Sequence, residues 1–138
     1  MGARSKARKR AIDLLYSADV REQSLNSAIA AENKRAESEP ARSASWTYAK
    51  QIVEGVVEHG YDIDELIETY AQGWTIARMP LTDRAIVRVG IWEILYNDEV
   101  PDAVAVSEAV DAATLLSTED SGGFVNGLLG RIVQTKSE

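Results

Sequence analysis

The sequence predicts an all-α protein, a compact bundle of about six to seven helices forming a single domain over residues 1–138. Apolar residues recur at helical spacing along most of the chain, and no stretch alternates apolar and polar residues as a half-buried strand does. Residues 83–97 are apolar around nearly their whole circumference, which is typical of the central helix of a domain. The chain is long enough for one hydrophobic core, and its apolar runs are too short to cross a membrane.

The amino-terminal part predicts two helices. Over about 5–21 one apolar stripe is formed by Ala7, Ala11, Leu14, Leu15 and Ala18. An alanine-rich pattern over about 25–37 predicts a weaker helix, which we expect Pro40 to end, with a serine-rich connection after it.

The rest of the chain predicts four or five more helices. A long apolar pattern over about 44–72 indicates one or two helices, with a break near Gly60. Thr82 is the expected N-cap of the central helix, and Pro101 marks the turn after it. A stripe over 104–117 follows, and Asp120 or Ser121 is the expected cap of the last helix.

Charge is distributed unevenly along the chain. Residues 1–10 hold five of the fifteen Lys and Arg residues and no acid, whereas residues 11–138 carry ten bases against twenty-two acids. A sequence pI near 4.8 argues against a surface coated by nucleic acid, but a local basic cluster still attracts phosphate because salt screens distant acids within about 8 Å.

The sequence gives little support for an enzyme, a cofactor or a metal site. It has no cysteine, which excludes disulfides and thiolate chemistry and favours an intracellular, cytoplasmic location. The single histidine, His59, has no partner pattern, and the acidic run "DIDELIE" lacks the spacing of a calcium loop. The glycines of "SGGFVNGLLG" follow no strand and carry no P-loop lysine.

Four separated stretches together resemble the NusB family of transcription antitermination factors. They are "ARKRAIDLLYSADV" (7–20), "DRAIVRVGIWEIL" (83–95), "VPDAVAVSEAVDAA" (100–113) and "DSGGFVNGLLG" (120–130). The resemblance implies a fold of two small helical sub-bundles and no enzymatic activity. It also implies binding to the single-stranded boxA segment of ribosomal RNA leaders, together with the small-subunit ribosomal protein NusE, in an antitermination complex on RNA polymerase.

The resemblance places RNA contacts on the basic first helix, and phosphate neutralisation is the main source of affinity for single strands. The predicted contacts there are Arg4, Lys6, Arg8, Lys9, Arg10 and Tyr16. Arg8 lies nearer the apolar stripe, so its stem could instead cover the edge of the core. Tyr16 shares a face with Lys9, where it could stack on an unpaired base or simply border the core.

Two further sites are predicted. The resemblance brings the loop before the last helix close to RNA, with Asp120 and Ser121 as contacts, although a plain N-cap would use the same residues. An acidic surface for a basic ribosomal partner is predicted at Asp62, Asp64, Glu65, Glu68, Tyr70 and Trp74, although Trp74 and Met79 could equally lie in the core.

The alternative hypothesis is a helical protein-interaction or dimerisation module without specific RNA binding. The sequence does not distinguish a monomer from a homodimer, and it leaves the fold of residues 22–43 and the RNA sequence that is read open.

Overall fold

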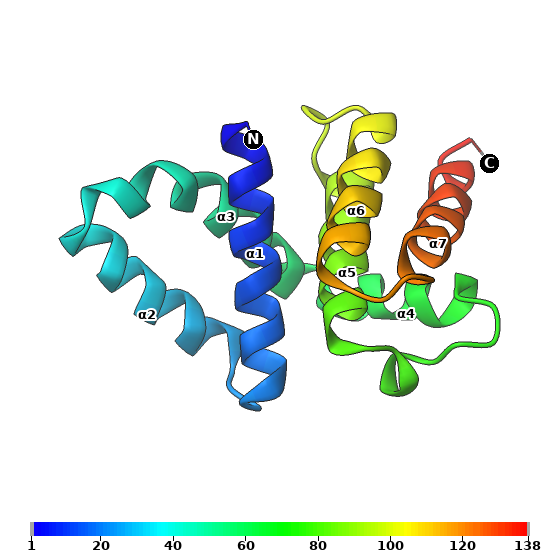
Figure 1. Ribbon diagram of the computed structural model, residues 1–138, viewed down its shortest axis with the longest axis horizontal. Helices are drawn as coiled ribbons and strands as arrows, with labels where there is room; N and C mark the ends of the chain where they lie inside the picture. Colours follow the sequence, from blue (N-terminus) through cyan, green and yellow to red (C-terminus); the bar gives the residue numbers. More distant parts are fainter. Residues whose placement is uncertain (1, 138) are drawn as a thin grey trace.

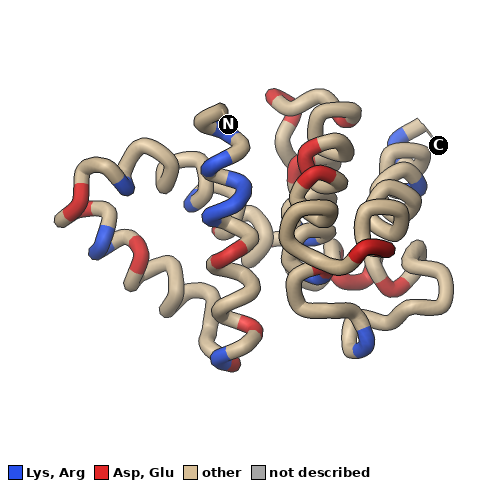
Figure 2. The backbone as a smooth tube through the Cα atoms, viewed as in Figure 1, with Lys and Arg blue, Asp and Glu red and all other residues tan. Residues whose placement is uncertain are grey.

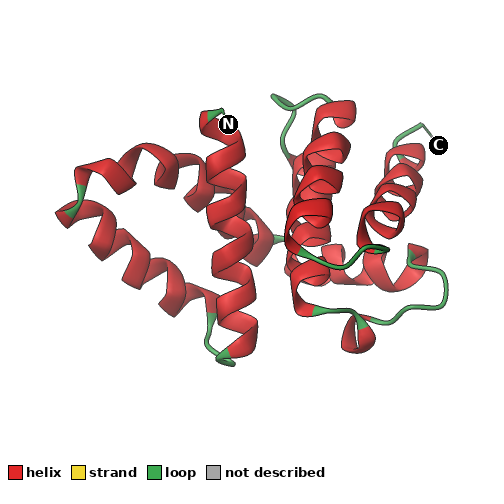
Figure 3. Cartoon of the chain, viewed as in Figure 1, coloured by secondary structure: helices red, strands yellow, loops and turns green. Residues whose placement is uncertain are grey.

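The computed structural model describes residues 2–137, and over this range the chain forms seven α-helices and one short 3-10 turn (Figure 1). The α-helices are α1 (Ala3–Val20), α2 (Leu25–Ser38), α3 (Pro40–Glu58), α4 (Gly60–Tyr70), α5 (Leu81–Tyr96), α6 (Asp102–Leu116) and α7 (Ser121–Thr135), and the 3-10 turn is Ile76–Arg78. The described residues contain no strand, as Figure 3 shows. The predicted all-α fold is confirmed.

The helices form two groups that meet along α1 and α5. Helices α1, α2 and α3 pack together in one group, and α5, α6 and α7 pack over α4 in the other (Figure 1). Helix α5 touches α1 and α3 on one side and α4, α6 and α7 on the other. It is therefore the central helix that its apolar circumference predicts.

One hydrophobic core runs through both groups without interruption. It joins side chains such as Leu15 and Ile52 of the first group to Ile91, Leu128 and Ile132 of the second, all fully buried. The helices approach closely where a glycine replaces a side chain. A Cβ atom at Gly55 of α3 would lie only 1.8 Å from the indole nitrogen of Trp92 on α5, so this contact between the groups needs glycine.

Two sequence predictions about helix ends are wrong. Pro40 begins α3 instead of leading into a serine-rich loop. Proline suits the first position of a helix, because an N–H there would have no acceptor within the helix. Helix α5 begins at Leu81, so Thr82 lies inside it. The carbonyl oxygen of Pro80 accepts from the Arg84 amide at 2.9 Å and starts the helix before Thr82. The predicted break near Gly60 is confirmed, since α3 ends at Glu58.

No helix within residues 2–137 is long and apolar enough to cross a membrane. The same residues contain no group of three or more His, Cys, Asp or Glu side chains arranged to hold a metal ion.

Candidate RNA-binding surface

An exposed ridge runs along α1. Lys6, Lys9, Asp13 and Tyr16 recur at helical spacing on the side of the helix away from its buried alanines and leucine, and Tyr16 remains 42% exposed. Figure 2 shows basic residues at the amino-terminal end of α1. The Lys9 ammonium lies 3.0 Å from the Asp13 carboxylate, an exposed ion pair that solvent screens. We name Lys6, Lys9 and Tyr16 the α1 ridge.

Arg8 points the opposite way, into the junction between the two groups of helices. Its Nε atom donates to both carboxylate oxygens of Glu93 on α5, at 2.8 and 2.9 Å, and both side chains are buried. Tyr48 of α3 donates its hydroxyl hydrogen to the same carboxylate, and the Asn97 amide donates to the Tyr48 oxygen at 3.0 Å. Arg8, predicted as an RNA contact or as a cover for the edge of the core, is buried and fixes α1 to α5.

The junction perturbs the acidity of its members. Burial raises the pKa of the Tyr48 hydroxyl, and the hydrogen bond to Glu93 and the charge of that carboxylate raise it further. Burial alone would lower the pKa of Arg8, but its hydrogen bond to Glu93 and the negative charge there raise it overall. Arg8 therefore stays charged, and Tyr48 stays neutral, over the whole physiological range.

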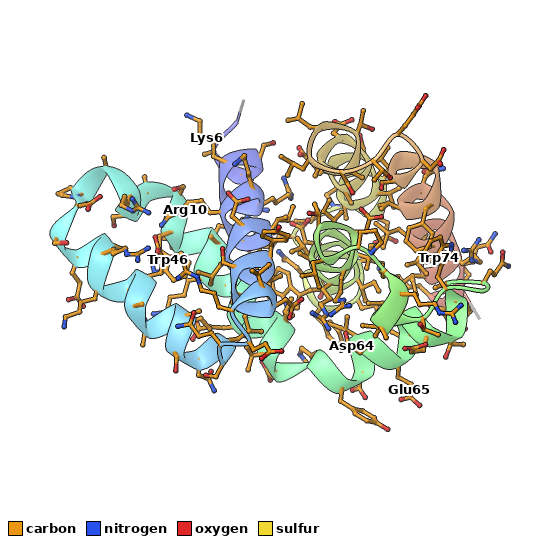
Figure 4. The ribbon with its side chains drawn as sticks, turned by 60° about the horizontal axis from the view of Figure 1, so that its bottom comes forward. Lys6, Arg10, Trp46, Asp64, Glu65 and Trp74 are labelled. Carbon is orange, nitrogen blue, oxygen red and sulfur yellow. The ribbon has the colours of Figure 1, made fainter. Side chains whose placement is uncertain are left out.

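Arg4 and Arg10, two other predicted contacts, already have partners in the protein. Arg4 lies 3.1 Å from the exposed Glu99 carboxylate and 4.6 Å above the Tyr48 ring. Arg10 binds Glu32 of α2 and stacks over Trp46 of α3 at 5.3 Å (Figure 4). Of the five predicted basic contacts, only Lys6 and Lys9 combine exposure with a place on the α1 ridge.

Two hollows flank the ridge. A small one of about 90 Å³ lies between α1 and α6, where Lys9 and Ile12 face Glu108 and Leu115. Leu115 is 71% exposed, so an apolar side chain stands beside the cationic one. The other hollow lies between α1, α2 and α3 and is lined mainly by polar side chains.

The loop before α7 is held by a buried carboxylate on α5. Asp83 accepts from the Ser121 hydroxyl at 2.9 Å and from the Ser117 hydroxyl, and Thr118 lies 2.8 Å from Ser121. Ser121, predicted as an RNA contact or an N-cap, is only 2% exposed, and its hydroxyl braces the loop. Asp120 stands at the N-cap position without capping the helix by its side chain, and it is exposed.

Asp120 borders a cavity of about 290 Å³ that also includes Trp74, Met79 and Phe124. The Trp74 and Phe124 rings lie 6.1 Å apart at a tilt of 59°. Trp74 is 48% exposed, whereas Met79 is buried in the core. The structure thus brings the predicted loop residue together with a residue predicted for the partner surface.

The predicted acidic partner surface is partly used inside the protein. Asp62, Glu65 and Glu68 are exposed on α4, and Figure 4 shows Glu65 at the edge of the molecule. Both oxygens of Asp64, however, accept from Arg88 of α5, at 2.9 and 3.0 Å, so Asp64 belongs to an internal network. Tyr70 packs against the core.

Sequence reasoning missed the carboxylates that organise these regions, Glu32, Asp83 and Glu93. Glu93 did give a signal, since "GIWEIL" places one acid within an otherwise apolar stretch of the central helix. A buried acid needs a cationic partner, and Arg8, on the apolar side of its own helix, was the matching residue.

Comparison with known proteins agrees with this architecture. A model of the NusB family matches residues 5–134. The transcription antitermination protein NusB of Leifsonia xyli subsp. xyli is 67% identical over 136 residues, which cover 99% of this chain and 94% of that protein. The protein of the same name from Clavibacter sepedonicus is 59% identical and covers 99% of this chain and 100% of that protein.

Two solved structures are similar as well. NusB of T. maritima superposes with a TM-score of 0.81 at 28% sequence identity, over 95% of this chain and 90% of that one. A chain from the crystal structure of the antitermination factors NusB and NusE in complex with dsRNA superposes with a TM-score of 0.78 at 27% identity, over 96% and 97% of the two chains.

Proposed function

Because this chain belongs to the NusB family of transcription antitermination proteins, which are not enzymes, we propose that it binds the boxA segment of nascent ribosomal RNA leaders. The RNA is bound as a single strand, and binding takes place in the cytoplasm. Residues 1–138 act as one RNA-binding domain. The core that continues through both groups of helices supports a single unit.

The observation that carries this proposal is the α1 ridge. Arg8 and Glu93 fix the rotation of α1, and this rotation leaves Lys6, Lys9 and Tyr16 exposed together. Two ammonium groups beside an accessible aromatic ring suit a single strand, in which phosphates pair with cations and unpaired bases stack. Asp120 is an exposed carboxylate able to accept from a base amino group, and it is the second proposed contact.

The proposed protein partner is the small-subunit ribosomal protein NusE, within the antitermination complex on RNA polymerase. A similar solved structure contains NusB and NusE in complex with dsRNA. The formal net charge of −7 favours encounter with a basic partner. Asp62, Glu65, Glu68 and the exposed Trp74 are the side chains proposed for this contact, whereas Asp64 is already paired with Arg88.

Fluorescence anisotropy with a boxA-like single strand tests the proposal, alone and with NusE present. We expect tighter binding to the boxA-like strand than to a scrambled one, and weaker binding as salt increases. Equal, salt-insensitive signals for both strands, with and without NusE, would refute RNA recognition and favour the protein-interaction module. Mass in solution, with and without RNA, distinguishes a monomer from a homodimer.

Replacing Tyr16 by Ala tests the aromatic contact. The loss of one stacked base is expected to weaken boxA binding by about 1–3 kcal/mol. Tyr61→Ala is the matched control, because Tyr61 is 81% exposed on α4, away from the ridge. Equal affinities of the two variants would exclude Tyr16 from the RNA contact.

A further inference from the structure

We propose that the hollow between α1, α2 and α3 is an additional phosphate subsite, in which Arg35 and Arg42 hold a backbone phosphate of the RNA bound on the α1 ridge. This inference rests on the proposed function and extends its site onto α2 and α3. The hollow has a volume of about 200 Å³ and is lined mainly by polar and charged side chains.

Three guanidinium groups converge on a single buried carboxylate there. Glu32 of α2 is only 6% exposed, and it binds Arg10 from α1, Arg35 at 3.3 Å and Arg42 from α3 at 3.4 Å. One carboxylate does not neutralise three guanidiniums. The base of the hollow therefore carries excess positive charge that the fold itself keeps in place.

The three arginines differ in how much of their hydrogen-bonding capacity the protein uses. Arg10 is fixed, since it also donates to the Arg42 carbonyl oxygen and to the Ser45 hydroxyl and lies over Trp46. Arg35 and Arg42 have side chains 60% and 43% exposed, and each donates one hydrogen bond, to Glu32, within the described residues. A guanidinium has five N–H donors, so both retain donors for a ligand.

Nearby acids leave this excess in place. Asp13 lines the hollow, but its carboxylate lies 3.0 Å from the Lys9 ammonium and forms no ion pair with Arg35 or Arg42 within the described residues. Glu39 approaches Arg42 only at 3.6 Å, and its side chain is more than half exposed, so solvent screens the pair. A planar guanidinium pairs well with phosphate oxygens, which makes a phosphate group the fitting ligand.

The position of the hollow identifies RNA as the source of that phosphate. Asp13 and Ser17 of α1 form one wall, and Asp13 stands between Lys9 and Tyr16 on the ridge. In Figure 4 the Arg10 and Trp46 labels lie on the side of α1 toward α2 and α3. The hollow that contains Arg35 and Arg42 therefore borders the α1 ridge.

The test measures RNA affinity against salt for the double variant Arg35→Gln/Arg42→Gln. Loss of one phosphate contact should make the salt slope of log K shallower by about 0.7. Binding at low salt should weaken by about tenfold, equally for boxA-like and scrambled strands, because a phosphate contact reads no sequence. The single variant Lys34→Gln is the control, since Lys34 is an exposed cation of α2 outside the hollow.

A second variant is expected to change RNA affinity in the opposite direction. Glu32→Gln keeps the side-chain shape but removes the carboxylate that competes with phosphate, so RNA binding should tighten. Glu37→Gln, which removes an exposed acid from the same helix, should tighten it less. Arg35→Lys/Arg42→Lys keeps both charges and should restore most of the salt slope, which separates a phosphate contact from damage to the fold.

Three results would overturn the inference. The first is unchanged RNA affinity and slope in the double Gln variant while Lys6→Ala/Lys9→Ala weakens binding, which would leave the proposed function standing. The second is loss of NusE binding with unchanged RNA binding, which would assign the hollow to a protein contact. The third is absence of RNA binding by the unmodified protein with NusE, which would refute the proposed function as well.

Discussion

Two buried carboxylates, Glu93 and Glu32, each bind an arginine from α1, but their other partners differ in exposure to solvent. Glu93 is 1% exposed, and its partners Arg8 and Tyr48 are themselves largely enclosed by the two groups of helices. Glu32 is 6% exposed, but Arg35 and Arg42 extend from it into solvent. The first carboxylate closes a junction, and the second presents cations at a surface.

The difference shows that a buried carboxylate stabilises the fold when its partners are enclosed with it. It supports ligand binding when its arginine partners keep hydrogen-bond donors exposed to solvent. At Glu93 the donors Arg8 and Tyr48 are enclosed with the carboxylate between α1, α3 and α5, so removing Glu93 takes the acceptor from two buried donors. At Glu32 two of the three arginines keep donors accessible to water, so their removal changes the surface more than the core.

The largest expected effect comes from breaking the closed junction. Glu93→Ala removes the buried acceptor of Arg8 and Tyr48 and leaves Arg8 only the partly exposed carboxylate of Glu108, 3.5 Å away, so it should lower the free energy of unfolding by about 3–5 kcal/mol, measured by urea denaturation. Glu99→Ala is the control, because Glu99 also pairs with an arginine of α1 but is exposed, and it should cost less than about 1 kcal/mol. Similar losses in the two variants would contradict the distinction.

Tyr48→Phe tests the same junction with a smaller change. It removes the hydrogen bond that Tyr48 donates to Glu93 and the acceptor for the Asn97 amide. The expected loss is about 1–3 kcal/mol in the free energy of unfolding. A variant as stable as the unmodified protein would show that the hydroxyl adds nothing to the junction.

The Tyr48 hydroxyl also predicts a pH dependence. Its pKa is raised in the folded protein, so its contribution is complete below the ordinary tyrosine pKa of about 10 and declines as the pH rises above that value. The stability difference between the unmodified protein and Tyr48→Phe should therefore shrink by about 1.4 kcal/mol per pH unit above pH 10. A constant difference would contradict a raised pKa.

The smallest stability effect is expected at the open cluster. Arg35→Ala removes one of three cations from Glu32, and its exposed position limits the cost to about 1 kcal/mol or less. Thermal unfolding compares it with Arg8→Ala, which should be several-fold more destabilising. Equal losses would show that both clusters are structural in the same way.

Sequence patterns predicted the helices well because each carries an apolar stripe of its own. The central role of α5 followed from residues 83–97 alone, and the exposed Lys6, Lys9 and Tyr16 lie where helical spacing put them. The boundary at Pro40 was misplaced because proline also ends helices, and only the packing of α3 against α1 shows which role it has here.

Helical spacing could not predict which polar residues pair with each other. Arg8 and Glu93 are 85 residues apart, and Ser121 and Asp83 are 38 apart, so only the packed fold brings them together. The same is true of Glu32, which joins arginines from three helices. The burial of Arg8 and Ser121 could not be predicted for this reason, since a charged or polar residue on a helix carries no information about a partner far away in the sequence.

The central claim, that the α1 ridge binds RNA phosphates, is tested most directly by the salt dependence of boxA binding in Lys6→Ala/Lys9→Ala. Loss of two phosphate contacts should make the slope of log K against log salt shallower by about 1.4, at an unchanged melting temperature. Lys34→Ala, which removes an exposed cation from α2, should change the slope less. An unchanged slope and affinity in the double variant would contradict the claim.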